Sequence, residues 1–386
     1  MTSTDRMPQI DALRGFALLG VCVVNAPVIA GAWILESGPD KSSIDHIVAW
    51  LVTALFTTKF YLLFSFLFGY SFAIQMDVAE RDRASFRRRH ARRLLGLLVI
   101  GSIHAVLLYP GDILTTYAAL GIPLFIIRRI HQRTALLIAL GLIIFLALTF
   151  AVTGVLALGF EDTSRVSGVL ATRSYRGGFL TIIHAHLRDY RQALGGAILY
   201  SAHLFSAQII GLIAGRRRLI LSDSSSSAVK KLIPLFLVVG VSGAVFTAMC
   251  SNGPLDDRFY YLGQAVDVAT APALAFLYAL GFLYLLDGSR GRFIIAALAP
   301  AGRMSMSNYL FQSLVFSIVF TGYGFGLYGT IGHAVLGISC LALYLVELAF
   351  SSWIMSRMRY GPVEAVLRRI TLGRMQMTRP RIKGSI

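Results

Sequence analysis

Charged side chains are scarce in this chain, and acidic ones are the scarcest. Only 14% of the 386 residues are charged, and 19 acidic residues stand against 36 basic ones. Soluble domains usually carry about 25% charged residues. This chain is instead 56% hydrophobic, with a mean hydropathy of +0.69. The composition excludes an ordinary soluble enzyme and indicates a polytopic membrane protein.

Familiar catalytic and metal-binding motifs are also missing. The three cysteines, Cys22, Cys250 and Cys340, lie in or beside apolar segments without the spacing of a metal or redox site. The chain has no P-loop, no G-x-S-x-G elbow and no H-E-x-x-H helix. We therefore expect no metal and no resident cofactor, and these absences leave open a site that is assembled in space without such a motif.

Long apolar runs predict an all-α fold with about ten transmembrane helices, because a spanning helix needs roughly 20 apolar residues. The first run, Ile10 to Ile34, is longer than the apolar core of a signal peptide, so we interpret it as a membrane helix. Residues 46–57 are predicted to form an interfacial or re-entrant helix. Further spans are predicted at 59–75, 94–109, 112–127, 135–158, 193–214, 232–249, 262–286, 293–320 and 331–355.

These spans are predicted to form a single membrane domain, 1–386, in two helical halves. The N-terminal half, 1–215, contains the predicted polar site. A charged, serine-rich linker, 216–231, separates it from the C-terminal half, 232–356. A basic tail, 357–386, follows.

The basic residues gather in clusters that all fall on one side of the membrane in this topology. An excess of Lys and Arg marks the cytoplasmic side, so we expect a bacterial inner-membrane protein with both termini in the cytoplasm. The basic loop 160–192 is the exception: it is predicted outside, with its amphipathic second half on the outer surface. Anionic lipid is the expected partner of the clusters, and nucleic acid is not, because no groove-reading motif accompanies them. The clusters are Arg81–Arg93, Arg128–Arg133, Arg216–Lys231, Arg290–Arg292 and Arg357–Lys383.

Two polar side chains interrupt the first span, where a charge costs roughly 2.5–3.5 kcal/mol on insertion scales. Arg14 follows Asp11 by one helical turn at the cytoplasmic end. It suits an ion pair with Asp11, or a cation that meets an entering phosphate or carboxylate. Asn25 lies eleven residues further, about 16 Å along the helix, and suits either a hydrogen bond between helices or a substrate contact.

A second group of polar residues lies near the outer ends of the following spans. Lys59 begins its span, where it reaches either the membrane interface or an anion such as Asp112. His104 and Asp112 flank the turn Pro110-Gly111 of a predicted hairpin. A histidine oriented by a carboxylate is a common general base, although Asp112 also suits the N-cap of the next helix. His46, at the outer face, is the second candidate base.

A third polar group follows a break in the ninth span at Pro300-Ala301-Gly302. Arg303 comes directly after the break, and Asn308 and Gln312 share one helix face at a spacing of four residues. This stripe suits the wall of a cavity beside a broken helix, or polar packing between helices.

Five motifs, in order and over nearly the whole chain, resemble the YeiB-like family of bacterial inner-membrane proteins of undefined function. Members of that family commonly have an aromatic residue where this chain has Ala365, and tryptophan is frequent at the position of Leu367. This departure argues against a site in the tail. The motifs are DALRGFALLGVCVVN, KFYLLFSFLFGYSF, RRLLGLLVIGSIHAVLLYPGDILTTYAALGI, GRMSMSNYLFQS and YGPVEAVLRR.

That family is similar to a broader group of transmembrane acyltransferases, which includes the heparan-glucosaminide acetyltransferase type and the acyltransferase-three type. The shared element is L-R-G with a polar residue eleven positions after the arginine, here Arg14 and Asn25. Acyltransferase-three proteins have a catalytic histidine at the second position, so that role does not transfer to Asn25. The glucosaminide type has asparagine there and a histidine farther on, to which His46 corresponds loosely.

Together these features predict an acyltransferase that moves an acyl group from cytoplasmic acyl-CoA to a glycan, lipid or small-molecule acceptor in or beyond the membrane. His104, oriented by Asp112, or else His46 is the expected base, and Lys59 or Asn25 the expected oxyanion donor. The alternative is a transporter or flippase that carries a small metabolite or lipid-linked group through the same polar cavity. A homo-oligomer is compatible with either function.

Overall fold

The computed structural model describes residues 7–36, 42–158, 164–219, 227–253, 255 and 257–373. Every regular element in these ranges is a helix, which confirms the predicted all-α membrane fold. Eight helical stretches are long and apolar enough to cross a membrane. The α-helices are α1 (Pro8–Ala30), α2 (Trp33–Glu36), α3 (Ser43–Leu55), α4 (Lys59–Arg81), α5 (Phe86–Leu107), α6 (Leu114–Ile126), α7 (Gln132–Ala157), α8 (Ser164–Tyr175), α9 (Phe179–Arg217), α11 (Ser227–Ser251), α12 (Tyr260–Asp287), α13 (Gly291–Arg303), α14 (Ser305–Phe320), α15 (His333–Arg357) and α16 (Pro362–Leu372).

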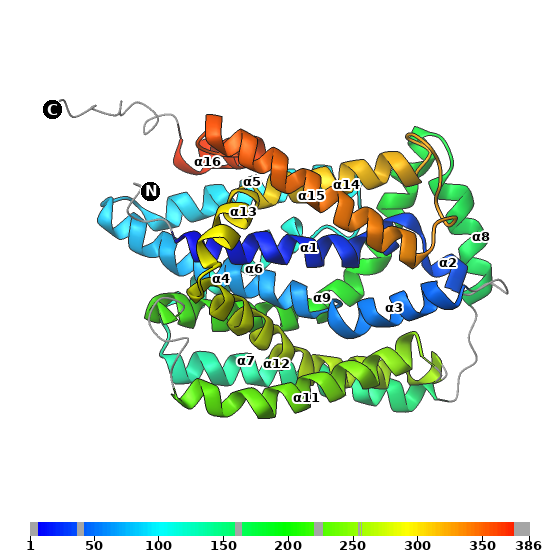
Figure 1. Ribbon diagram of the computed structural model, residues 1–386, viewed down its shortest axis with the longest axis horizontal. Helices are drawn as coiled ribbons and strands as arrows, with labels where there is room; N and C mark the ends of the chain where they lie inside the picture. The colour runs from blue at the N-terminus through cyan, green and yellow to red at the C-terminus, as the bar shows by residue number, and fades with distance from the viewer. Residues whose placement is uncertain are drawn as a thin grey trace.

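Helix α1 lies near the middle of the bundle, and most of the other long helices are roughly aligned with it (Figure 1). It packs against α4, α12, α13, α14 and α15, and its apolar window is the most buried among the candidate spans. Two glycines allow its backbone to touch that of α13. A Cβ atom on Gly15 would lie 2.3 Å from the carbonyl oxygen of Leu298, and one on Gly302 would lie 1.7 Å from that of Asp11. Small residues commonly permit such close approach of membrane helices.

The bundle has two ends that differ in charge. The turn between α4 and α5, the start of α7 and helix α16 lie at the same end, drawn on the left in Figure 1, and we call it the basic end. The opposite end, which carries α2 and α8, is called the far end. The predicted helix at 46–57 corresponds to α3, and a kink at Thr58, with φ of 67°, separates it from α4.

The hairpin of α5 and α6 differs from the prediction. Helix α5 begins at Phe86, so part of the basic block is helical, and α6 has only 13 residues, about 20 Å. The turn residues of the hairpin, Pro110 and Gly111, are half-buried and exposed, respectively, whereas Tyr109 and Asp112 on either side are buried. His186, seven residues into α9, bonds the carbonyl of Val106, and Ser317 of α14 donates to the carbonyl of Leu108. Helices α9 and α14 therefore both pack against the end of α5.

The prediction of a loop at 160–192, followed by a span from residue 193, is wrong over most of its length. Helix α9 starts at Phe179 and continues unbroken for 39 residues, about 58 Å. No proline or glycine occurs between residues 179 and 194, so nothing in the backbone interrupts the helix at its polar residues. Residues 164–175 form α8, and residues 159–163 lie outside the described ranges.

The ninth predicted span is broken, as expected, but at Met304 rather than at Pro300-Ala301-Gly302. Helix α13 continues through those three residues and ends at Arg303, and α14 begins at Ser305. The basic tail is partly folded, because α16 packs against α5 and α14. The centre of the predicted linker, 220–226, and the tail beyond residue 373 lie outside the described residues.

Candidate functional site

A cavity of about 1170 Å³ enters the bundle from the basic end. Its walls come from α1, α4, α5, α6, α13, α14 and α16. Eight arginines and three carboxylates line it, so the described lining carries an excess of positive charge. The arginines are Arg14, Arg81, Arg83, Arg89, Arg93, Arg303, Arg359 and Arg368.

The chemistry of the walls changes with depth. The arginines lie on the turns of the helices nearest the basic end, and apolar side chains replace them further in. The inner end is bounded by two tyrosines, Tyr117 of α6 and Tyr309 of α14. An occupant that fits these walls has an anionic head and a longer, less polar body. The apolar inner lining includes Leu18, Val21, Phe64, Leu67, Phe68, Leu97, Ile113 and Leu114.

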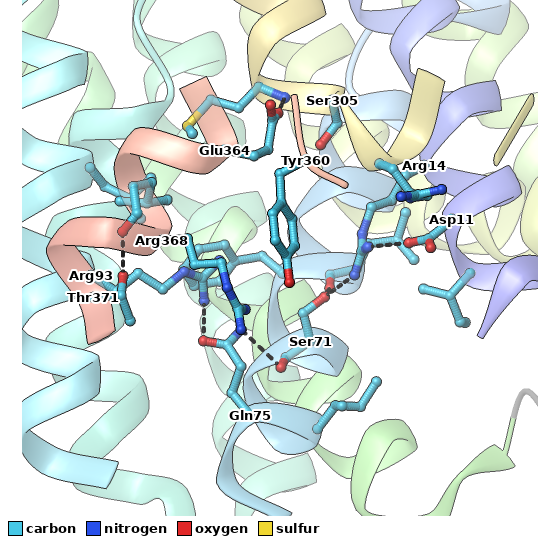
Figure 2. A pocket seen from close by; sticks show the side chains of 18 of the residues that line it. Asp11, Arg14, Ser71, Gln75, Arg93, Ser305, Tyr360, Glu364, Arg368 and Thr371 are labelled. Atoms are coloured by element: carbon cyan, nitrogen blue, oxygen red, sulfur yellow. Dashed lines mark hydrogen bonds and ion pairs between the residues drawn. The ribbon is translucent and has the colours of Figure 1, made fainter. Parts of the chain in front are cut away.

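Two arginines face the cavity where the basic outer part meets the apolar inner part. Arg14 pairs with Asp11 at 2.7 Å, and its second terminal nitrogen donates to the hydroxyl of Ser71. Arg93 donates to the side-chain oxygen of Gln75 at 2.9 Å. Figure 2 shows these two arginines held from opposite sides of the cavity by the same stretch of α4.

Helix α16 supplies part of the cavity wall. The carboxylate of Glu364 accepts hydrogen bonds from the backbone amides of Met306 and Ser307, at 2.8 and 3.0 Å, and so binds the first turn of α14. Tyr360 extends into the cavity, with the guanidinium of Arg368 4.7 Å from its ring centre (Figure 2). The sequence argued against a site in the tail, but the tail motif helps to build this cavity.

His104 and Asp112 form a buried pair beyond the inner end of the cavity. The Nδ1 atom of His104 lies 2.8 Å from Oδ1 of Asp112. The second carboxylate oxygen of Asp112 accepts from the backbone amide of Thr115 at 2.7 Å. Both roles considered for Asp112 therefore occur together, because one oxygen bonds the start of α6 and the other bonds the histidine.

The other ring nitrogen of His104, Nε2, is buried and has no hydrogen-bond partner. The ring of Tyr309 lies 4.9 Å from that of His104, and the Tyr309 hydroxyl is buried beside the backbone of Ile113. Tyr309 therefore stands between the cavity and the histidine. Buried polar atoms usually have partners, and exceptions often mark functional groups. We call Tyr61, Tyr109, Tyr117 and Tyr309, which lie around this pair, the tyrosine cluster.

Comparison with known proteins shows what the chain is similar to. Residues 214–374 match the family described as "Protein of unknown function (DUF418)". The chain is 29% identical to YxaH of Bacillus subtilis (strain 168), over 96% of this chain and 95% of YxaH. It is 25% identical to YeiB of Escherichia coli (strain K12), over 95% of this chain and 97% of YeiB. The chain is thus similar to YeiB and YxaH over nearly its whole length, in agreement with the resemblance seen in the sequence motifs. YxaH and YeiB are both named as uncharacterized proteins, and no solved structure matches this chain.

Lys59 does not lie at the membrane interface but is buried between helices. Its ammonium group lies 2.7 Å from Oδ1 of Asp267 in α12, and both side chains are buried. Lys59 also donates to the backbone oxygen of Thr53 at 3.4 Å. The pair connects α4 to α12 and does not line the cavity, so Lys59 does not reach Asp112.

The other predicted residues of the N-terminal half divide between the cavity and the helix packing. Arg14 lines the cavity. Asn25 accepts a hydrogen bond from the hydroxyl of Tyr61 at 2.7 Å, which links it to the tyrosine cluster. His46 lies on α3, which packs against α11 and α15, and it does not line the cavity. The structure therefore brings together His104 and Asp112 but leaves His46 apart from them.

The three polar residues of the ninth predicted span also differ in their contacts. Arg303 lines the cavity and donates to the backbone oxygen of Arg359 at 2.9 Å. Asn308 donates to Ser351 at 2.9 Å and Gln312 to Glu347 at 2.8 Å, both across to α15. Neither amide lines this cavity, so their contacts match the alternative of polar packing between helices.

Sequence reasoning missed several residues of the cavity. Arg93 was counted in a basic cluster and interpreted only as a topology signal. Ser71 and Gln75 are polar residues four positions apart in an apolar helix, and this spacing was a usable signal. Tyr309 gave no signal, because aromatic residues are common in membrane helices. Among the described residues, no three His, Cys, Asp or Glu side chains are grouped to hold a metal ion.

Proposed function

We propose that this protein is a membrane acyltransferase that takes an acyl group from an acyl-CoA donor entering at the basic end. The donor's phosphates lie among the arginines, and its acyl thioester lies at the tyrosine cluster. The acceptor is a hydroxyl or amine that approaches His104 from the membrane or from the far end. The positive-inside rule supports a bacterial inner membrane with the basic end in the cytoplasm, where acyl-CoA is made.

One observation carries this proposal: a carboxylate-oriented histidine with an unpartnered nitrogen lies next to the inner end of a basic, then apolar, cavity. A carboxylate on Nδ1 fixes the tautomer that leaves Nε2 free to accept a proton. Burial of both groups keeps water from competing with the acceptor.

In the proposed reaction His104 first accepts a proton from the acceptor and then donates it to the leaving thiolate. Nε2 of His104 takes the proton of the acceptor hydroxyl as its oxygen attacks the thioester carbonyl carbon. The tetrahedral intermediate carries an oxyanion, for which the proposed donor is the buried hydroxyl of Tyr309, whose ring lies 4.9 Å from that of His104. The carbon–sulfur bond then breaks, and the protonated His104 returns the proton to the leaving thiolate. The products are the acylated acceptor and free CoA.

Acyl-CoA turnover by the purified full-length chain tests the proposal. Proteoliposomes prepared from lipids of a bacterial membrane supply lipid acceptors. Release of free CoA from radiolabelled acetyl-CoA is measured together with the label transferred to lipid. We expect His104→Ala to reduce the rate at least 100-fold and Asp112→Asn about 10–100-fold, because general-base catalysis typically contributes 10²–10⁴-fold.

His46→Ala is the matched control, since it removes a histidine that lies outside the cavity. We expect it to keep the wild-type rate. Equal loss in His46→Ala and His104→Ala, or full activity in His104→Ala, would contradict the assignment of the base.

Transport remains the second candidate, and the buried Lys59–Asp267 pair is the observation that favours it. Ion pairs inside membrane domains often lie on proton or substrate pathways. This candidate predicts counterflow of a solute in proteoliposomes without acyl-CoA, with loss in Asp267→Asn and none in His104→Ala. The acyltransferase proposal predicts instead that acyl-CoA turnover is lost in His104→Ala and kept in Asp267→Asn.

A further inference from the structure

The transition between the basic and apolar parts of the cavity contains a site of its own. Ser71 and Gln75 lie one turn apart on α4, and the amide of Gln75 donates to the backbone oxygen of Ser71 at 3.0 Å. Ser71 accepts from Arg14 of α1, and Gln75 accepts from Arg93 of α5. One turn of α4 therefore holds two guanidinium groups from two other helices toward the same space (Figure 2).

The charges at this point do not balance. Arg14 has a carboxylate partner in Asp11. The contacts of Arg93 are the neutral side chain of Gln75 and the ring of Phe68, 4.9 Å from the guanidinium carbon. Arg93 is only partly exposed, and the charge of Arg14 acts on it across the cavity. Two cations with one anion in a partly desolvated space favour the binding of a further anion.

We propose that Arg14 and Arg93 form a clamp for the phosphate group of a phosphate ester whose tail extends into the inner cavity. Guanidinium groups present planar pairs of N–H donors that match phosphate oxygens, and such charge-assisted bonds are among the strongest in proteins. The contacts to Ser71 and Gln75 fix both side chains before the ligand arrives.

The distance from the clamp to His104 indicates the length of that tail. Arg93 and His104 lie eleven residues apart on α5, about 16 Å along the helix axis. The pantetheine arm of CoA has twelve bonds from its phosphate ester oxygen to its sulfur, about 15–16 Å when extended. A phosphate at the clamp therefore brings a thioester to the tyrosine cluster. This match of lengths rests on the proposed function, whereas the preference for phosphate does not.

Binding to the full-length protein in zwitterionic nanodiscs, measured by titration calorimetry, tests the clamp without any need for turnover. The first pair of probes is phosphopantetheine and pantetheine, which differ only in the phosphate. The second pair is farnesyl phosphate and farnesol, which present the same phosphate on a lipid tail. We expect phosphopantetheine to bind at least tenfold more tightly than pantetheine.

Arg93→Gln should reduce this phosphate preference to about threefold or less and leave the affinity for pantetheine unchanged. Arg128→Gln is the matched control, because it removes the same charge from an arginine that contacts Phe125 and does not line the cavity. It should keep the full preference. Arg93→Lys, which keeps the charge but loses the planar donor pair, should give an intermediate value, and a thermal unfolding midpoint shows that each variant is folded.

The outcomes separate the clamp from the proposed function. A phosphate preference confined to the farnesyl pair and lost in Arg93→Gln would uphold the clamp for a lipid phosphate and overturn the acyl-CoA donor. If neither pair shows a phosphate preference, or if folded Arg93→Gln and Arg93→Lys keep it in full, the clamp does not exist.

Discussion

Two ion pairs within the bundle differ in how far their side chains are exposed. The side chains of Lys59 and Asp267 are 1% and 4% exposed, whereas those of Arg14 and Asp11 are 24% and 15% exposed and face the cavity. Both pairs have the same nitrogen–oxygen distance of 2.7 Å. Distance alone therefore does not distinguish a pair that holds helices together from one that lies beside a binding space.

The difference lies in what surrounds each pair. The sealed pair is neutral as a unit, and its cost of burial is offset by its own attraction and by the contact of Lys59 with Thr53. The open pair lies near Arg93, whose charge has no carboxylate partner. We infer that the sealed pair fixes the position of α4 against α12, and that the open pair leaves capacity for a ligand.

The largest expected effect comes from breaking the sealed pair. Lys59→Met leaves Asp267 as an uncompensated buried charge, and such a loss costs about 3–5 kcal/mol. We expect a large fall in the free energy of unfolding, measured by denaturation in mixed micelles. The double variant Lys59→Met/Asp267→Leu should recover most of this loss, because no charge then remains buried. Equal destabilisation in the single and double variants would show that the charge is not the cause.

A smaller effect is expected from opening the wall of the cavity. Glu364→Ala removes the acceptor of two backbone amides at the start of α14, a loss of about 1–2 kcal/mol by analogy with helix caps. Hydrogen exchange should increase in residues 362–372 and change little in α7, which lies away from this contact. Unchanged exchange in α16 would mean that other contacts hold it in place.

The smallest effect on stability is expected from the open pair. Asp11→Asn keeps the size of the side chain and removes a partly exposed ion pair, which is typically worth about 0–1 kcal/mol. Its effect on binding should have the opposite sign to its effect on stability. With its carboxylate partner gone, Arg14 should hold a phosphate about threefold more tightly, measured with phosphopantetheine. Weaker binding would indicate that Asp11 orients Arg14 for the ligand.

The sequence predicted the helices well because each long apolar run has one stable form in a membrane. It predicted the basic end for the same reason, since the arginine clusters lie outside the apolar runs. It failed at α9, where apolar content falls between residues 184 and 192 although the helix continues. Hydropathy measures transfer into lipid and does not detect a helix with one face on protein: His186 is buried and bonds Val106, whereas His184, Arg188, Arg191 and Gln192 are exposed.

The candidate site was predictable only in part. The pairing of His104 with Asp112 followed from their positions on either side of a short turn, which limits how far apart they can lie. The partner of Lys59 was not predictable, because Asp267 is 208 positions away in the chain and no local pattern joins them. The same holds for Glu364 and the start of α14, since contacts between distant segments depend on how whole helices pack.

The contact between α16 and α14 also bears on how the protein is made. Helix α16 is the last described helix to be synthesised. It binds the first turn of α14, which begins at Ser305 and is therefore made earlier. Every long helix can therefore be inserted before the cavity has its complete wall. A chain released early, after residue 357, would resemble the finished protein in the membrane yet lack the aromatic and cationic groups of residues 359–368 around its entrance. The wall of the cavity is in this sense completed only after its long helices have been synthesised.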